Sequence, residues 1–241
     1  GAGSAVVTGL VADIDADGLL TGTLNVTTNA NGTANTIEIA AGSGATTVSG
    51  GEAADTININ ASALTDNLTL SLFGAAKMNV TNLVADISAA SLTGDLHATL
   101  KAGGASSTIV GGGGTDTVVG STSNDTLSLT SIENIDMKAG IDLVTMTDGS
   151  LANADLGDGD DKLSLGASTT ATIVGGIGND SVTGSGEADT LRLTTVETVN
   201  AGAGNDNITV TDTSLLSAIL VSGTNTLTFE VGNALDDQTI L

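Results

Sequence analysis

Cysteine, proline, tryptophan and tyrosine are all absent from this chain of 241 residues, and Phe73 and Phe229 are its only aromatic residues. Without cysteine, no disulfide can stabilise the fold. The absence of proline favours a chain that is nearly all β-ladder, because each proline would remove a ladder hydrogen bond. A globular domain of this size normally buries aromatic rings, whereas a narrow solenoid can be filled by aliphatic side chains alone. These absences favour an all-β chain with a narrow core.

Basic residues are scarce as well. Five lysines and arginines face 28 aspartates and glutamates, which gives a formal net charge of −23. A chain without a basic patch has nothing to neutralise phosphates, so nucleic acid is excluded as a partner. A compact chain of this charge repels itself. We therefore expect it to need counter-cations to fold well.

Long apolar runs are also missing, since no stretch reaches the roughly 18–20 residues that span a membrane. No signal peptide is recognisable, and the chain begins with Gly1 rather than methionine. We therefore expect a start that is processed or cut from a longer polypeptide. The lack of cysteine is weak support for a bacterial protein that is exported unfolded and acts outside the cell.

The residues that catalysis usually needs are few. His97 is the only histidine, and a zinc site normally needs several histidine or cysteine ligands. We expect His97 to be a solvent-facing strand residue. Enzymes that cut polysaccharides on β-helices use paired carboxylates, but they usually add basic and aromatic residues for the sugar. An enzyme is therefore not expected, and a polysaccharide-active one is only the weakest alternative.

A nine-residue frame of glycines, an aspartate and a large apolar residue is the most informative feature present. It is intact at residues 111–119 (GGGGTDTVV) and intact again at 175–183 (GGIGNDSVT). The offset between these two copies also relates Asp125 to Asp189 and Asp142 to Asp206, so a long segment of the chain is duplicated. A fixed period of this kind is typical of a solenoid, and this frame is that of a calcium-binding β-helix repeat.

The register of the frame extends beyond the two intact copies. Residues 102–128 and 166–192 each hold three frames head to tail, and single frames follow at 137–145 and 201–209 after short spacers. A further frame fits 156–164, and a degenerate pair at 41–58 carries Thr46 and Asp55 at the sixth position. The eighth residue should point into the core; it is Val118, Leu127, Leu163, Val182, Leu191 or Ile208.

The frame suits a hard cation. Glycines at positions one, two and four allow positive φ and inward-pointing carbonyls, and the aspartate at position six adds a charged oxygen. Calcium takes six to eight such oxygen ligands. The acidic run Asp13-Ile14-Asp15-Ala16-Asp17-Gly18 opens like a calcium loop too, although an EF-hand would need Glu where Leu24 stands. The candidate ligands are Asp13, Asp15, Asp17, Asp55, Gly111, Gly112, Gly114, Asp116, Asp125, Asp142, Asp158, Asp160, Asp161, Gly175, Gly176, Gly178, Asp180, Asp189 and Asp206.

These motifs resemble the RTX (repeats-in-toxin) calcium-binding β-roll family, strongly at 102–128 and 166–209 and more loosely at 41–58 and 137–164. The resemblance implies a right-handed parallel β-solenoid with Ca²⁺ between the loops of successive turns. It also implies a bacterial protein that is secreted and folds when it meets calcium. The family includes toxins, proteases, lipases, adhesins and S-layer proteins, so the repeat alone does not define the function.

We expect one solenoid domain over residues 1–241, with degenerate turns at 1–101, calcium-binding turns at 102–209 and, at 210–241, a segment without the frame that serves as a C-terminal cap or as an assembly segment. Segment 83–93 could be a short helix instead of a strand. The apolar run 215–221 should cap the end of the roll or, as the second choice, form a subunit contact, because repeat arrays must cover their terminal edges.

The function expected from these features is structural. The non-repeat parts, rich in threonine, asparagine, alanine and leucine, are similar in composition to bacterial S-layer and large surface proteins. We expect a calcium-stiffened protein of the cell surface or biofilm matrix that assembles with itself into a layer or filament, with cell-surface polysaccharide as a further candidate partner. The alternative is a calcium-binding segment of a larger secreted adhesin or toxin.

Overall fold

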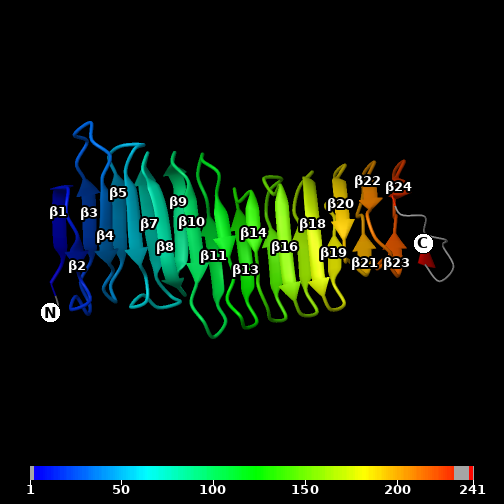
Figure 1. Ribbon diagram of the computed structural model, residues 1–241, viewed down its shortest axis with the longest axis horizontal. Helices are drawn as coiled ribbons and strands as arrows, with labels where there is room; N and C mark the ends of the chain where they lie inside the picture. Colours follow the sequence, from blue (N-terminus) through cyan, green and yellow to red (C-terminus); the bar gives the residue numbers. More distant parts are fainter. Residues whose placement is uncertain (1–2, 231–238, 241) are drawn as a thin grey trace. The chain divides into compact units, whose positions relative to one another are not determined.

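The computed structural model describes residues 3–230 and 239–240 and contains strands but no helix in that part of the chain. The residues form two compact units, Gly1–Val119 and Gly120–Leu241, which are described separately below. Within each unit, parallel strands are stacked turn upon turn, and consecutive strands belong alternately to two sheets (Figure 1). The predicted fold class, an all-β parallel solenoid of the β-roll type, is confirmed.

The described residues of the first unit form twelve strands, which belong alternately to two sheets. One sheet has the order β1 (Ala5–Leu10), β3 (Leu24–Thr28), β5 (Thr46–Gly50), β7 (Thr69–Gly74), β9 (Asp86–Leu92) and β11 (Ser106–Val110). The other has the order β2 (Ile14–Asp15), β4 (Thr36–Ala40), β6 (Thr56–Asn60), β8 (Lys77–Leu83), β10 (Leu96–Leu100) and β12 (Thr117–Val119).

The second unit repeats this arrangement. One sheet runs β13 (Thr126–Thr130), β15 (Leu143–Met146), β17 (Lys162–Leu165), β19 (Ser181–Thr183), β21 (Thr198–Asn200), β23 (Ser217–Ile219) and β25 (Thr239–Ile240). The other runs β14 (Asn134–Asp136), β16 (Asn153–Asp158), β18 (Thr170–Ile177), β20 (Thr190–Thr194), β22 (Asn207–Val210) and β24 (Thr226–Phe229).

Alternating side chains fill a narrow core between the two sheets of each unit. The predicted core residues at position eight of the frame are all at most 2% exposed: Val118, Leu127, Leu163, Val182, Leu191 and Ile208. Each buried aliphatic side chain of this size stabilises the fold by about 1.5–3 kcal/mol. Phe73, by contrast, is 40% exposed. The core is thus built from aliphatic residues, as the scarcity of aromatic residues predicts.

The long duplication places equivalent residues on opposite sheets of the second unit. Asp125 precedes β13 in one sheet, whereas its equivalent Asp189 precedes β20 in the other. The spacer after residue 128 shortens one turn, so that the hydrogen bond from Asp125 to Asp142 has a sequence separation of 17 and the next, from Asp142 to Asp161, one of 19. The two copies are therefore an odd number of strands apart, which is half a turn out of phase.

Segment 83–93 is not a helix, so that alternative was wrong. Residues Asp86–Leu92 form β9, in which Ile87 and Ala89 are buried. Their positions, two apart in the sequence, place both side chains on the core face of a strand. In the run 215–221, Leu215 and Ala218 are buried, but Leu216 and Val221 are 55% and 64% exposed. Residues 231–238 and 241 of the expected C-terminal cap or assembly segment (210–241) lie outside the described residues.

Candidate calcium loops

Eight aspartates of the repeat frame are almost completely buried where the chain turns from one sheet to the other. All are at most 1% exposed: Asp55, Asp116, Asp125, Asp142, Asp161, Asp180, Asp189 and Asp206. Burying an ionised carboxylate is strongly unfavourable unless it is paired with an opposite charge or with hydrogen-bond donors. The partners of each carboxylate therefore show what its loop can bind.

Three loops, which we call the closed loops, are 111–116, 120–125 and 184–189. In each, the backbone N–H at position two donates to Oδ2 of the loop's own aspartate: Gly112 to Asp116 (2.6 Å), Ser121 to Asp125 (2.8 Å) and Ser185 to Asp189 (2.7 Å). The other oxygen also accepts a backbone N–H in two of these loops, from Leu96 to Asp116 and from Thr169 to Asp189. Backbone donors inside the fold thus satisfy these carboxylates.

Four other loops, which we call the open loops, are 137–142, 156–161, 175–180 and 201–206. They share positive φ at frame positions two and four, namely at Lys138 and Gly140, Gly157 and Gly159, Gly176 and Gly178, and Gly202 and Gly204. The corresponding residues of the closed loops, all of them described, have no positive φ. Among these seven loops, the left-handed conformation expected from the glycine frame is therefore present in the open ones alone.

In the open loops only one carboxylate oxygen has a hydrogen-bond partner. Oδ1 accepts the backbone N–H of the aspartate one turn earlier: Asp125 donates to Asp142 (2.7 Å), Asp142 to Asp161 (2.7 Å), Asp161 to Asp180 (2.9 Å) and Asp189 to Asp206 (3.0 Å). The Oδ2 atoms of Asp142, Asp161, Asp180 and Asp206 are buried without a partner. Asp55 in the first unit also has a buried, unpartnered Oδ2. Buried oxygens of this kind need a cation or a proton.

The buried environment of the open loops also raises the pKa values of three of their aspartates. Burial raises the pKa of Asp142 to about 6, with the charges of Asp125 and Asp161 adding to the effect and the N–H of Asp125 opposing it. Burial likewise raises the pKa of Asp180 to about 6, and the neighbouring charge of Asp161 adds to it. The pKa of Asp161 is raised for the same primary reason. Without a cation, these carboxyl groups therefore retain protons to higher pH than an exposed aspartate does.

The loops fit a calcium ion, because carbonyl oxygens gather beside the carboxylates. A Cβ on Gly159 would overlap the carbonyl oxygen of Gly140, and one on Gly178 would overlap that of Gly159. A Cβ on Gly175 would lie 2.6 Å from Oδ2 of Asp180. Only glycine leaves the space between these stacked oxygens empty. Carboxylate and carbonyl oxygens are the ligands that calcium prefers.

Several predicted ligands do not turn inward beside the buried aspartates. Asp13, Asp15 and Asp17 are exposed, and the first two use an oxygen to accept the backbone N–H of Glu38 and Asp17. Asp158 and Asp160 are exposed as well, and Asp160 accepts a bond from Asn179. The described residues contain no group of three acidic, histidine or cysteine side chains close enough to hold a metal. Any ion would therefore depend on backbone oxygens for most of its ligands.

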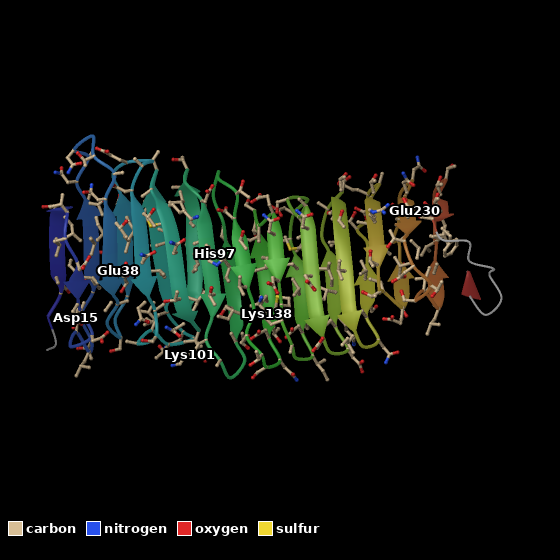
Figure 2. All side chains as sticks on the ribbon, in the orientation of Figure 1. Asp15, Glu38, His97, Lys101, Lys138 and Glu230 are labelled. Atoms are coloured by element: carbon tan, nitrogen blue, oxygen red, sulfur yellow. The ribbon has the colours of Figure 1, made fainter. Side chains whose placement is uncertain are left out.

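Three participants were missed by the sequence pattern. Glu197 accepts the N–H of Asp180 at 2.7 Å, and Asn225 accepts that of Asp206 at 2.9 Å. Each lies one turn after the last frame on its own side of the solenoid. Glu197 and Asn225 follow Asp180 and Asp206, respectively, by one full turn. A search of the sequence for polar residues at that spacing would have found both. Lys138, labelled in Figure 2, adopts φ 74° at a position where the frame has glycine, and no sequence signal predicts that conformation for lysine.

His97 lies half-buried on β10 between the buried Leu96 and Ala98, and its side chain faces outward, as expected (Figure 2). No helix in the described part of the chain is long and apolar enough to cross a membrane.

Comparison with known protein families supports calcium binding by these loops. A family model for the RTX calcium-binding nonapeptide repeat matches in four copies, at residues 93–127 and 165–193. These segments include the three closed loops and the open loop 175–180, but not the open loops 137–142, 156–161 and 201–206. No curated protein and no solved structure matches the chain. RTX nonapeptide repeats bind calcium and are typical of secreted bacterial proteins.

Proposed function

We propose that this chain, an RTX-repeat protein with a β-roll fold, is a calcium-stiffened structural protein that acts outside the bacterial cell and assembles with copies of itself. The observation that carries the proposal is the row of buried aspartates whose Oδ2 atoms have no partner in the protein. Loops with such buried, unpartnered carboxylates are stable only when a cation or a proton neutralises them. Calcium would supply the positive charge that these aspartates lack.

Three sets of residues would contribute to calcium binding and to the stability of the loops. The aspartates at position six provide charge, the glycines at positions two and four let the backbone carbonyls approach, and the aliphatic residues at position eight hold the loops to the core. The net charge of −23 adds a long-range repulsion that cations relieve. Extracellular calcium modules bind with dissociation constants of about 10⁻⁴–10⁻³ M, so millimolar calcium would switch such a chain from loose to rigid.

Self-assembly is supported by the beginning of the first unit. Its outermost described strands, β1 and β2, border a hollow of about 500 Å³ whose lining includes Val7, Ile14 and Leu19. Val6 on β1 is 71% exposed. Among the described residues no strand pairs with the outer edge of β1 or β2, and strand edges beside exposed apolar side chains are a template for another chain. The chain has neither proline nor many lysines to block such pairing. A surface layer or matrix filament is the assembly we propose.

Light scattering and negative-stain microscopy of the full chain, with chelator and with millimolar calcium, test the proposal. We expect small species in chelator and long ordered assemblies after calcium is added. A monomer that binds calcium but does not assemble at high protein concentration would refute the building-block function. It would favour instead a calcium-binding segment of a larger adhesin or toxin.

A further inference from the structure

The loop that joins β3 to β4 in the first unit contains Asn31, the only asparagine of the chain that is followed by glycine. Both Asn31 and Gly32 are exposed. Gly32 has φ 76°, a conformation that glycine adopts without strain. No atom lies within 4 Å of the place that a Cβ would take on Gly32. Gly32 is therefore uncrowded at the surface, directly after the Asn31 side chain.

Two hydrogen bonds act on the side-chain amide of Asn31 and on the backbone nitrogen that follows it. The N–H of Thr33 donates to Oδ1 of Asn31 at 2.9 Å and so draws electrons away from the amide carbon, Cγ. The N–H of Gly32 donates to Oε1 of Glu52, which lies 20 residues later in the loop between β5 and β6. An electrophilic carbon, a neighbouring nitrogen and a carboxylate at that nitrogen's proton are the parts of an intramolecular acyl transfer.

Two other asparagines show what is special about Asn31. Asn60 and Asn200 also accept, through Oδ1, the N–H of the residue two positions later, both at 3.1 Å. Each is followed by a buried alanine, Ala61 or Ala201, whose N–H donates to a backbone carbonyl one turn on at 2.9 Å. These two nitrogens are held in the β-ladder and cannot turn toward the asparagine. Only at Asn31 does the next nitrogen belong to a glycine and face a carboxylate.

We propose that Asn31 is a self-modification site, at which the backbone nitrogen of Gly32 attacks Cγ of Asn31 with Glu52 as the base. The N–Cγ bond forms while Glu52 takes the proton from the nitrogen. Negative charge collects on Oδ1, where the N–H of Thr33 stabilises it. The Cγ–Nδ2 bond then breaks, and the proton passes from Glu52 to the departing ammonia. Water opens the resulting succinimide ring at either carbonyl and leaves aspartate or isoaspartate at position 31.

The reaction would change the corner that holds the buried Asp55. Asn35 links the two residues, because its backbone and side-chain nitrogens donate to Oδ1 of Asp55 at 2.9 Å and 3.0 Å. The same side-chain nitrogen lies 3.5 Å from Oδ1 of Asn31. A carboxylate at position 31 adds a negative charge and competes with Asp55 for this donor. The inference depends neither on calcium binding nor on assembly.

Peptide mapping by mass spectrometry tests the proposal on the full chain, kept in H₂¹⁸O with calcium at neutral pH and physiological temperature for several weeks. The Asn31 peptide should exchange its –NH₂ for –¹⁸OH and separate into aspartate and isoaspartate forms. The peptides that contain Asn60 and Asn200 are internal controls and should convert about tenfold more slowly or not at all, because a ladder hydrogen bond holds the next nitrogen. An Asn31 that stays intact, or that converts no faster than Asn60, would overturn the proposal.

The variant Glu52→Gln tests the base separately from the Asn-Gly sequence. Glutamine can still accept the N–H of Gly32 but cannot take its proton at neutral pH, so E52Q should convert several-fold more slowly than the parent chain. In denaturant, where residue 52 no longer faces Gly32, the two chains should convert at the same rate. Equal rates in the folded chains, or a faster E52Q, would remove Glu52 from the reaction.

A second variant keeps the proposal testable if E52Q does not fold. Gly32→Ala retains Glu52 but places a Cβ beside the attacking nitrogen, at a φ that alanine rarely adopts. G32A should therefore convert about tenfold more slowly than the parent chain, in buffer and in denaturant alike. Conversion of G32A at the parent's rate would contradict attack by the nitrogen of residue 32.

Discussion

Buried apolar side chains close corners in both units, but the second unit buries six aspartates at its corners where the first buries two. Ala41, Ala61, Leu64, Ala76 and Ala85 are all at most 2% exposed between strands of the first unit. Asp55 and Asp116 are its buried acids, and amide groups satisfy part of each: Asn35 donates its backbone and side-chain nitrogens to Oδ1 of Asp55. In the second unit six buried aspartates occupy the corners: Asp125, Asp142, Asp161, Asp180, Asp189 and Asp206.

The difference teaches that one architecture can be stabilised in two ways. Apolar corners are stabilised by burial alone, which does not depend on ions. The carboxylate corners of the open loops are unfavourable until they are neutralised, because each holds a buried oxygen without a hydrogen-bond donor. The first unit should therefore fold without calcium, and the second should need it.

Removing calcium should have the largest effect, and it should be confined to the second unit. In a chelator, we expect the backbone amides of β15, β17 and β19 to exchange hydrogen near the rate of an unfolded chain, because the open loops that precede these strands would lack counter-charges. Amides of β4, β6 and β8 should remain protected. Hydrogen exchange read by mass spectrometry resolves the two units within the full chain. Equal loss of protection in both units would show that the residues at the corners do not make the two units differ in their need for calcium.

Core substitutions in the two units should differ in how their effect on stability depends on calcium. Ile57 is fully buried in β6, and Ile57→Ala should destabilise the first unit by about 2–5 kcal/mol, the usual range for such a cavity. The shift should be the same with and without calcium, because no ion lies in an apolar corner. Leu163→Ala in β17 is the matched variant, and its effect should be measurable only when calcium is present. Denaturant titration followed by hydrogen exchange checks both.

Acidity should partly replace calcium. Asp142 and Asp180 have pKa values of about 6 in the folded chain, against an ordinary value of 3.8. Between these two values the folded state binds more protons than the unfolded state, so stability falls as the pH rises from 3.8 to 6. In chelator, the second unit should therefore have a higher Tm at pH 4.5 than at pH 7. A Tm in chelator that is independent of pH would contradict the raised pKa values.

The smallest effect should come from the ion pair between Arg192 and Glu230, which spans two turns of the second unit. Its side chains are 47% and 45% exposed, and solvent screens such pairs strongly. Arg192→Gln should therefore leave the thermal transition nearly unchanged and should shift it less than either core variant. A shift as large as that of Ile57→Ala would mean that surface charge pairs, and not the corners, distinguish the units.

The two intact frames show how far sequence reasoning reaches into the site. Residues 111–116 and 175–180 match the same pattern, and the pattern predicts equivalent roles for Asp116 and Asp180. In the fold, Asp116 is bonded to its own Gly112, while Asp180 bonds to the N–H of Asp161 and keeps one oxygen unpaired. A single frame describes one corner. The conformation of that corner depends on the loop stacked against it, which is about a turn away in sequence.

The sequence by itself determined the class of fold, the residues that fill the core and the acids that turn inward at the corners. It could do so because strand alternation, glycine turns and the period of the repeat are local properties. They recur often enough along the chain to be recognised without knowing which turns stack on each other. Only the tertiary structure decided which corners are open and which are closed, that segment 83–93 is a strand, and that the duplicated copies in the second unit lie on opposite sheets. Those outcomes depend on hydrogen bonds between successive turns and on turns of unequal length, whose differences accumulate along the chain and decide which residues face each other. Each carboxylate of the open loops finds its partner one turn away, and stacking alone brings the two together.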